Sequence, residues 1–303
     1  MTEKTDNMVP SRDQILCPGC GGPGKTRNYR VDDYDLYRCR NCSTEFLVLR
    51  PGGKAFEKTY WDAYKFEGYS NPAALADYSA RYAEIFTEAR KYAPRMNTVL
   101  DVGCGIGNFL AWAADPESIG PKSPVGAEVD TPAVDEARSR GFEVHYISEL
   151  QSKCEPESFD VLTMWDVIEH LEDPSAAVGG VIDLLRQDGL MILETPDVKF
   201  PLRPLSIALR KVAEPIRYSD ILYFAGHRTY FSAEGLAALL EPHGLEVMTT
   251  MRMRSPSGKM SNLFSNMDGG ASGRSLAKLY KPLEASMKAT GLSNKLIMIL
   301  RKT

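Results

Sequence analysis

The amino-acid sequence predicts an α/β protein in which a mostly parallel sheet is covered by helices and a small cysteine-rich module comes first. Two observations support this prediction. Between residues 98 and 193, short apolar runs alternate with helical patterns, which is typical of a parallel sheet wrapped by helices. Between residues 15 and 50, two pairs of cysteines lie among short strand-like runs such as EFLVL.

The composition is that of an ordinary globular protein. The 303 residues are 43% hydrophobic and 25% charged, which is enough for one large domain and a small additional module. The net charge of -4 gives no general attraction to polyanions, so nucleic acid is not favoured as a partner. No stretch approaches the roughly 18 apolar residues that span a bilayer, and the first sixteen residues hold no signal-like apolar run. We therefore expect a cytoplasmic protein.

The first structured element is predicted around two C-x2-C motifs. Cys17 and Cys20 form one pair, Cys39 and Cys42 form the other, and eighteen residues separate the pairs, which matches a four-cysteine zinc signature. In a reducing compartment this pattern indicates metal binding and not disulfides. Four thiolates complete the tetrahedral shell of zinc and leave no position for water. The sequence therefore predicts a structural zinc ribbon over residues 15–50.

The segments on either side of the ribbon are predicted to be simpler. Residues 1–14 are polar and are expected to be loose. Residues 51–97 are expected to form a helical connector, because apolar residues recur at helical spacing from Pro72 to Tyr92. This helix must end before Pro94 and is expected to cover one face of the sheet.

The remaining residues are predicted to form the rest of the sheet and its helices. Gly141 and Gly189 stand where helices are expected to stop. A further helix is expected from Ser232 to Glu241, followed by two strands, GLEVMTTMRM and NKLIMILRK. These two strands would form an antiparallel edge of the sheet.

The segment LDVGCGIGNFL is the first candidate ligand site. A buried strand is followed by Gly103, Gly105 and Gly107, which let the backbone turn tightly and approach a ligand closely. Asp101 places a carboxylate beside this turn, which suits an ammonium group and disfavours phosphate. Glu128 ends the next strand, about 20 residues on, where an acidic side chain accepts hydrogen bonds from ribose hydroxyls. The pattern favours a nucleoside that carries an amino acid; the alternative is a tight turn in an unrelated α/β fold.

Four segments resemble class I S-adenosylmethionine-dependent methyltransferases, and most closely the branch of the ubiquinone-biosynthesis O-methyltransferases. They are, in order, LDVGCGIGNFL, VGAEVD, SFDVLTMWDVIEHLEDP and GLMILETPD. The resemblance covers about residues 98–246, and NKLIMILRK is similar to the last strand of that fold. It implies a Rossmann-like, seven-stranded, mostly parallel sheet with an antiparallel last strand. The methyltransferase domain would span residues 98–303, with a lid-like insertion at about 197–231.

The resemblance also implies S-adenosylmethionine as cofactor and a role for each matching residue. The positions that match its cofactor-binding residues are Asp101, Gly103, Gly105, Gly107, Glu128, Val129, Trp165 and Asp166. The first four would line the methionine and ribose portions, Glu128 would hold the ribose, Val129 would pack on adenine, and the last two would border the sulfonium. Members often place an acidic residue after the third strand to meet the adenine amine, whereas the aligned position here is about Ser148.

Two histidines are candidate catalytic residues, because a hydroxyl acceptor benefits from a base that titrates near neutrality. His170 follows the fourth strand at the carboxyl edge of the sheet, where open α/β folds bind ligands; the alternative is a packed residue that orients the loop. His227 would face the acceptor from the loop after the fifth strand, as the resemblance implies. His145 and His243 are interpreted as structural.

The acceptor is predicted from charge and from the ribbon. Residues 199–217 contain five basic residues and one acidic residue, which suits a lid over an anionic or lipid-linked acceptor, or a surface helix packed on its own domain. The stretch YRCRNCSTEFLVLRP resembles zinc-ribbon members of the small-molecule branch more than zinc-ribbon rRNA methyltransferases. We therefore predict O-methylation of a small-molecule, natural-product or glycan-type acceptor. The alternatives are an rRNA or tRNA methyltransferase and a non-catalytic scaffold that binds S-adenosylmethionine or a protein partner.

Overall fold

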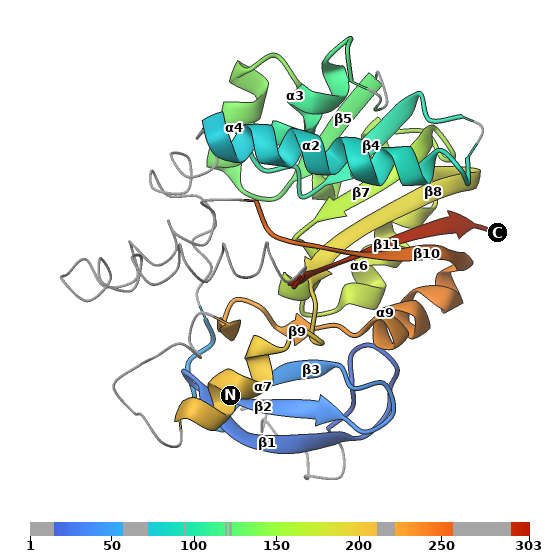
Figure 1. The fold of residues 1–303 in the computed structure, drawn as a ribbon. Helices are drawn as coiled ribbons and strands as arrows, with labels where there is room; N and C mark the ends of the chain where they lie inside the picture. Colours follow the sequence, from blue (N-terminus) through green and yellow to red (C-terminus); the bar gives the residue numbers. More distant parts are fainter. Residues whose placement is uncertain are drawn as a thin grey trace, which may run out of the picture.

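The computed structural model describes residues 15–56, 72–93, 95–118, 120, 123–210, 222–256 and 292–303. The predicted loose segment at residues 1–14 lies outside these ranges, as do residues 211–217 of the basic segment. Within them, a large sheet with helices on both faces lies above a smaller sheet (Figure 1). None of the described helices is both long and apolar enough to cross a membrane.

The large sheet has seven strands in the order β10-β11-β8-β7-β4-β5-β6. The strands β4 to β8 pair in parallel, whereas β11 is antiparallel to both of its neighbours. This arrangement confirms the predicted mostly parallel sheet with an antiparallel last strand. The strand bounds are β4 (Thr98–Val102), β5 (Ser123–Glu128), β6 (Glu143–Tyr146), β7 (Phe159–Trp165), β8 (Leu185–Pro196), β10 (Leu245–Met253) and β11 (Lys295–Lys302).

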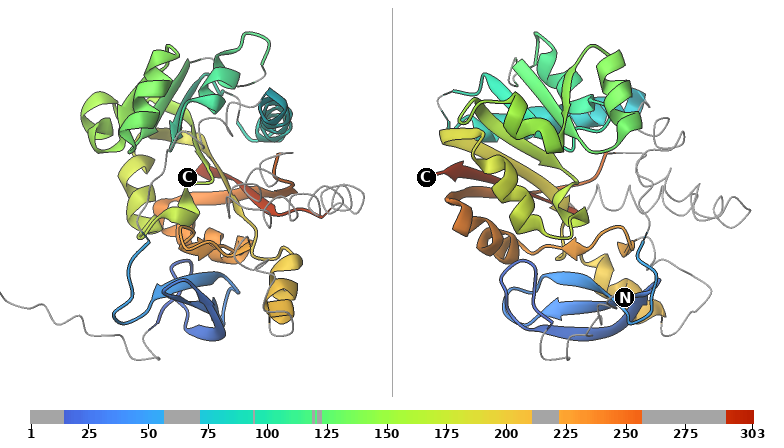
Figure 2. Two further views of the ribbon diagram at one scale, coloured as in Figure 1. Left: turned by 90° about the vertical axis from the view of Figure 1, so that its left-hand side faces the viewer. Right: turned by 180° about the vertical axis from the view of Figure 1, so that it is seen from behind.

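Two apolar clusters fill the space between this sheet and its helices. One face is covered by α2 (Pro72–Ala89), α3 (Asn108–Ala114) and α4 (Thr131–Ser139), whose buried side chains form one cluster with the strands. The other face is covered by α6 (Pro174–Ile182) and α9 (Ala233–Leu240) together with the short α5 (Leu150–Lys153). Figure 2 shows α2 and α6 on opposite sides of the sheet. Each helix therefore buries one apolar stripe, as its sequence period predicts.

The helix stop predicted at Gly141 is confirmed, whereas the stop predicted at Gly189 is wrong. Gly141 follows α4 with a φ of 89°, the left-handed conformation that favours glycine. Gly189 lies inside β8, and α6 ends at Ile182. A Cβ at position 189 would lie 2.6 Å from the Leu185 side chain, so this glycine permits close packing within a strand and does not end a helix.

The smaller sheet combines the N-terminal module with a strand from the region predicted as a lid-like insertion. Its order is β1 (Gly24–Val31), β2 (Tyr34–Cys39), β3 (Glu45–Leu49) and β9 (Thr229–Tyr230), and all pairs are antiparallel. The helix α7 (Leu202–Arg210) lies beside it (Figure 1). Side chains of β1 to β3 share one buried cluster with Val198, Ile207, Tyr223, Ala225 and Tyr230. The N-terminal module is thus packed on the part of the chain that lies between the large sheet and β9.

Candidate active site and cysteine cluster

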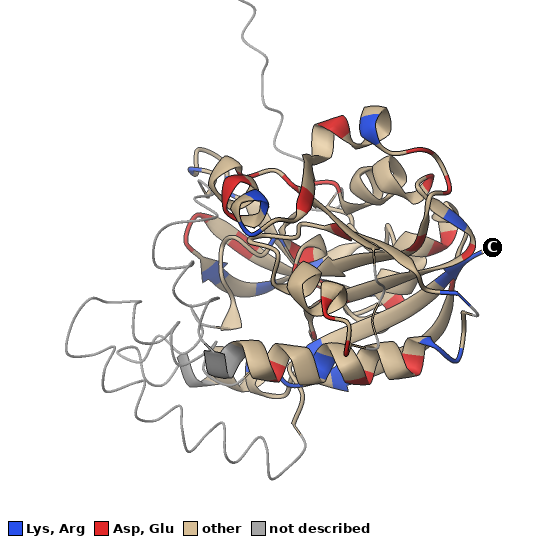
Figure 3. Ribbon diagram, turned by 90° about the horizontal axis from the view of Figure 1, so that it is seen from above, with Lys and Arg blue, Asp and Glu red and all other residues tan. Residues whose placement is uncertain are grey.

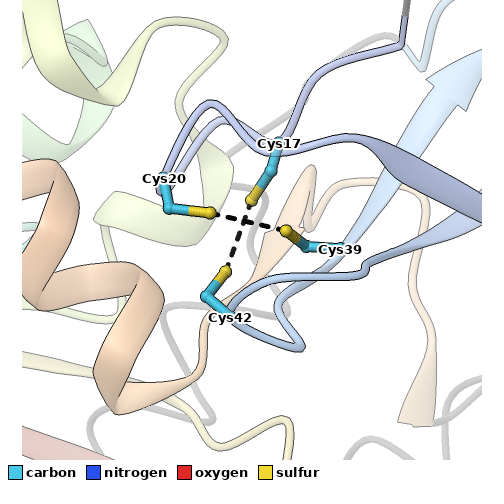
Figure 4. Close-up of side chains that lie close together, drawn as sticks. All are labelled: Cys17, Cys20, Cys39 and Cys42. Atoms are coloured by element: carbon cyan, nitrogen blue, oxygen red, sulfur yellow. Dashed lines mark hydrogen bonds between the residues drawn. The ribbon is translucent and has the colours of Figure 1, made fainter. Parts of the chain in front are cut away.

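The four predicted metal-binding cysteines lie together. Their sulfur atoms are all within 4.8 Å of one another and point toward a common centre (Figure 4). The Sγ atoms of Cys17 and Cys42 are 3.7 Å apart, and those of Cys20 and Cys39 are 3.4 Å apart. A tetrahedral zinc site with Zn–S bonds of about 2.3 Å requires sulfur separations of about 3.8 Å. The cluster therefore fits a four-thiolate zinc site.

Backbone N–H groups support the thiolate form in this cluster. Gly19 donates to the sulfur of Cys17, and Asn41 donates to that of Cys39. Burial raises the pKa of Cys39, but the N–H groups of Cys42 and Asn41, together with hydrogen bonds from the neighbouring thiols, outweigh it and lower this pKa to about 7. Burial raises the pKa of Cys17 and of Cys20, so the thiolate form is favoured first at Cys39. Because zinc binds thiolates and not thiols, these donors also favour metal binding.

The cysteine cluster packs against the first turn of α9. Ser232 caps this helix by accepting a hydrogen bond from the Gly235 N–H, and its hydroxyl donates to the carbonyl of Cys42 at 2.6 Å. A Cβ at Gly235 would lie 2.1 Å from the Thr44 hydroxyl and 2.9 Å from the Cys42 sulfur. No side chain fits between the helix and the cluster, so the two are in direct contact.

The N-terminal module also holds the loop that contains His227. The Leu47 N–H donates to the carbonyl of Arg228 at 2.9 Å, and the Tyr223 hydroxyl donates to Glu45 at 2.6 Å. The Arg228 guanidinium lies 5.0 Å from the centre of the Tyr34 ring. The loop around His227 is therefore positioned by residues far away in the sequence.

The glycine loop has the predicted tight turn. Gly103, Gly105 and Gly107 have φ values of 78°, 54° and 82°. A Cβ at Gly103 would lie 2.4 Å from the Val167 side chain, so this position needs glycine for both its conformation and its surroundings. The loop connects β4 to α3 at the carboxyl end of the sheet, where α/β folds bind their ligands.

Glu128 closes the glycine loop. This buried carboxylate accepts hydrogen bonds from the N–H groups of Gly105 at 2.9 Å, Val129 at 2.7 Å and Asp130 at 3.2 Å. A carboxylate offers about four acceptor positions, so one position remains for a further donor such as a hydroxyl. Val129 follows with its side chain 59% exposed, which gives an apolar surface beside the loop. Ser148 is exposed after β6, in the short helix η2 (Ile147–Glu149).

Asp101 is buried at the end of β4 with one strong partner. The Thr163 hydroxyl donates to its Oδ1 at 2.6 Å. The pKa of Asp101 is raised to about 7, chiefly by burial and also by the nearby Glu128 charge, and the Thr163 hydrogen bond only partly offsets this rise. A cation bound next to Asp101 would restore its ionised form.

Trp165 and Asp166 lie at the carboxyl end of β7. The Trp165 ring packs 5.0 Å from that of Tyr82 and 5.2 Å from that of Phe109, and its Nε1 is buried with no hydrogen-bond partner among the described residues. Asp166 has a φ of 55° and forms an ion pair with Lys295, the first residue of β11. Sequence reasoning missed Lys295, whose only signal is a basic residue at the start of a predicted strand.

His170 and His227 meet, although 56 residues separate them in the chain. Their ring centres are 4.6 Å apart at 74°, and the Nδ1 of His170 donates to the carbonyl of Gly226 at 2.8 Å. Burial lowers the pKa of His227 well below its ordinary value, and the charges of His170 and Lys295 lower it further. The imidazole of His227 is therefore neutral at physiological pH.

Glu169 is a third member of this cluster that sequence reasoning missed. It is completely buried, and its Oε2 accepts a hydrogen bond from the Thr195 hydroxyl at 3.1 Å. Burial raises the pKa of Glu169 to about 8; the neighbouring Asp166 charge raises it and the Lys295 charge lowers it. One ligand atom from each of Glu169, His170 and His227 lies within 4.8 Å of the others. The signal was an acidic residue directly before His170 in DVIEHLEDP.

The other two histidines are engaged elsewhere. His145 on β6 lies 3.1 Å from a carboxylate oxygen of Glu143. The Nε2 of His243 lies 3.0 Å from the Ser175 hydroxyl, next to the helix stop at Gly244. Neither histidine belongs to the cluster.

The described part of the basic segment is largely engaged within the fold. Arg203 is buried, donates to the carbonyl of Asp197 at 3.1 Å, and lies 4.2 Å from the centre of the Tyr230 ring. Lys199 forms an ion pair with Glu234 at 2.7 Å. Among the described residues, basic and acidic positions alternate along the ribbon in the view of Figure 3.

Comparisons with known proteins identify the family to which most of the chain belongs. A family model described as "Methyltransferase domain" matches residues 74–250. The ubiquinone biosynthesis O-methyltransferase of Haemophilus ducreyi is 32% identical over 104 residues, covering 32% of this chain and 44% of that protein. The enzyme of the same name from Neisseria meningitidis is 30% identical over 137 residues, covering 41% and 50%. The chain thus spans about half the length of the curated relatives it matches.

One solved structure shows the likeness of fold. It is a putative sarcosine dimethylglycine methyltransferase from Galdieria sulphuraria, which is 16% identical with a TM-score of 0.50. The match covers 74% of this chain and 86% of that one.

Proposed function

This chain belongs to the methyltransferase domain family, and we propose that it transfers a methyl group from S-adenosylmethionine to a hydroxyl oxygen of a small-molecule acceptor. The observation that supports this most is the glycine loop closed by Glu128 with Asp101 buried beside it. The names of the relatives from Haemophilus and Neisseria favour a small hydroxylated acceptor.

The residues at the carboxyl edge of the sheet fit the cofactor. We assign the buried carboxylate of Asp101 to the ammonium group and the remaining acceptor position of Glu128 to a ribose hydroxyl. The exposed Val129 supplies an apolar surface for adenine, and Ser148 offers a hydroxyl where relatives often have a carboxylate. S-adenosylmethionine would supply the methyl group, and Trp165 and Asp166 at the carboxyl end of β7 would lie beside its sulfonium.

The cluster of Glu169, His170 and His227 is proposed as the acceptor site. Methyl transfer requires alignment of the acceptor oxygen with the methyl group and removal of the hydroxyl proton. A neutral His227 beside an oriented His170 can accept a hydrogen bond from that hydroxyl. Both candidate catalytic histidines would therefore contribute to the same acceptor site, His227 by accepting the hydrogen bond and His170 by packing against it.

The four cysteines are proposed to hold a structural zinc ion. Their sulfur separations suit tetrahedral zinc, and the site lies against α9 and not at the carboxyl edge of the large sheet. Its function would be to stabilise the module that pairs with β9. Because reduced thiolates are required, we place the protein in the cytoplasm.

Calorimetric titration of the full, zinc-loaded chain with S-adenosylmethionine tests the proposal. We expect binding by the wild type and a loss of about 10- to 100-fold in affinity for Glu128→Ala, since hydrogen bonds to charged groups contribute about 1.5–3 kcal/mol. The matched control is Glu136→Ala, an exposed acidic residue of α4, which should bind as the wild type does. If the folded wild type does not bind S-adenosylmethionine, the proposed methyltransferase activity is excluded. Strong, salt-dependent RNA binding would instead favour RNA methylation.

A further inference from the structure

We propose that Glu169, His170 and His227 bind one divalent transition-metal ion, and that this ion holds the acceptor oxygen. The first observation is their convergence. Glu169 and His170 belong to the short helix η3 (Ile168–His170) after β7, whereas His227 comes from the turn before β9. One ligand atom of each lies within 4.8 Å of the other two.

The second observation is an unsatisfied carboxylate oxygen. Glu169 has no exposed surface, and its Oε1 has no hydrogen-bond partner in the described part of the chain. Leaving a buried polar atom without a partner is destabilising, and more so for a charged group. The neighbouring Lys295 is paired with Asp166. A cation placed between Glu169 and the two imidazoles would supply the missing interaction.

The third observation is that both η3 ligands are oriented by further hydrogen bonds. The Nδ1–H of His170 donates to the carbonyl of Gly226, so the lone pair of this ring is on Nε2. Thr195 donates to the Oε2 of Glu169 and so orients its carboxylate. Metal-binding histidines and carboxylates are commonly held in this way, because the second hydrogen bond sets the tautomer and the direction of the ligand.

The ligand set indicates the class of metal. Two imidazoles and one carboxylate suit ions such as Mn²⁺, Fe²⁺, Co²⁺ or Zn²⁺, whereas four thiolates select zinc. Ligand bonds of about 2.1 Å place neighbouring ligand atoms about 3.0–3.4 Å apart, so the three side chains must move slightly inward to share an ion. Three protein ligands also leave coordination positions open, unlike the cysteine site.

This inference rests on the proposed methyl transfer for its chemical role. An acceptor oxygen bound at an open position would lose its proton to water more readily, because a cation lowers the pKa of a bound hydroxyl. The oxygen–methyl bond then forms, and the sulfur–methyl bond breaks with its electron pair returning to sulfur. With the ion bound, His227 and His170 act as its ligands, and the bond from the acceptor oxygen to the ion replaces the direct hydrogen bond from the acceptor hydroxyl to His227.

Titration with Mn²⁺ alone tests the site without any substrate. The zinc-loaded full chain is titrated while electron paramagnetic resonance measures the unbound ion, since Mn²⁺ does not compete for thiolates. We expect one ion per chain, with affinity at least about tenfold weaker in His170→Ala, His227→Ala and Glu169→Gln. His145→Ala is the matched control, because this histidine lies on β6 and outside the cluster.

Two further measurements keep the outcomes distinct. S-adenosylmethionine binding should be unchanged in Glu169→Gln, which shows that the variant is folded. Absence of Mn²⁺, Co²⁺ and Zn²⁺ binding at the cluster of the wild type, or binding that the three substitutions leave unaltered, overturns the metal site. Methyl transfer that continues at full rate with the cluster metal removed by a chelator overturns its chemical role but leaves the proposed function intact. Metal binding without S-adenosylmethionine binding refutes the proposed function and this chemical role, but leaves the metal site standing.

Discussion

Replacing Asp101 by Asn should stabilise the protein without its cofactor and weaken cofactor binding. The substitution removes the charge but keeps the shape and an oxygen that accepts from Thr163. In the folded protein the pKa of Asp101 is about 7, raised from an ordinary value of 3.8 chiefly by burial. A carboxyl with a raised pKa binds its proton more tightly in the folded state, so stability falls as pH rises from 3.8 to about 7.

The size of the effect follows from these two pKa values. Relative to the Asn variant, the wild type should lose about 2.5 kcal/mol of unfolding free energy between about pH 5 and pH 8. Urea unfolding of both proteins without cofactor at several pH values measures this difference, and titrations common to both proteins largely cancel. If the difference in unfolding free energy between the wild type and the Asn variant is the same at every pH from 5 to 8, the pKa of Asp101 is not raised.

The binding half of this prediction has the opposite sign. An ammonium group beside Asp101 requires the carboxylate, so affinity for S-adenosylmethionine should increase as pH rises from about 5.5 to 7, by up to tenfold per unit. The Asn variant should bind at least about tenfold more weakly at pH 7.5 and lose this pH dependence. Calorimetry over this range measures both quantities. A flat affinity for the wild type would show that the ammonium group does not lie at Asp101.

Three other predictions concern the cysteine module and the glycine loop. Ser232→Ala removes the cap of α9 and the hydrogen bond to the carbonyl of Cys42. Urea unfolding should show that the free energy of unfolding falls by about 1–2 kcal/mol. The control Ser139→Ala, at an exposed helix end, should lower it by less than about 0.5 kcal/mol. Removing zinc with a chelator should speed hydrogen exchange of the Leu47 amide, which donates to the carbonyl of Arg228 just before β9, and should leave the glycine-loop amides protected. If the Leu47 amide exchanges equally fast with and without zinc, the metal does not stabilise the pairing between β3 and this loop. Gly103→Ala should destabilise by about 1–3 kcal/mol and weaken cofactor binding, because of its positive φ and the Val167 contact. The control is Gly180→Ala in α6, where a Cβ faces open space, so the free energy of unfolding should stay the same or rise. If both variants lose the same unfolding free energy, the loop does not require glycine at position 103.

The parts of the site predicted correctly depend on short sequence separations. The glycine loop needs three glycines within five residues, and each cysteine pair needs a spacing of three. The backbone between such residues has few conformations, so spacing alone indicates how their atoms lie. The alternation of strands and helices similarly predicted the sheet, whereas Gly189 was wrong because a glycine inside a strand and one that ends a helix look alike in sequence.

The sequence by itself determined the fold class, the grouping of the four cysteines and the tight glycine turn after β4. Only the tertiary structure decided that Glu169 lies beside His170 and His227 with one carboxylate oxygen unpartnered among the described residues. It also decided that Lys295 pairs with Asp166 and that β9 joins the sheet of the cysteine module. Apart from the adjacent Glu169 and His170, these contacts join residues from 57 to more than 180 positions apart. Their formation depends on how helices and strands pack against one another, because no local backbone preference connects such distant residues.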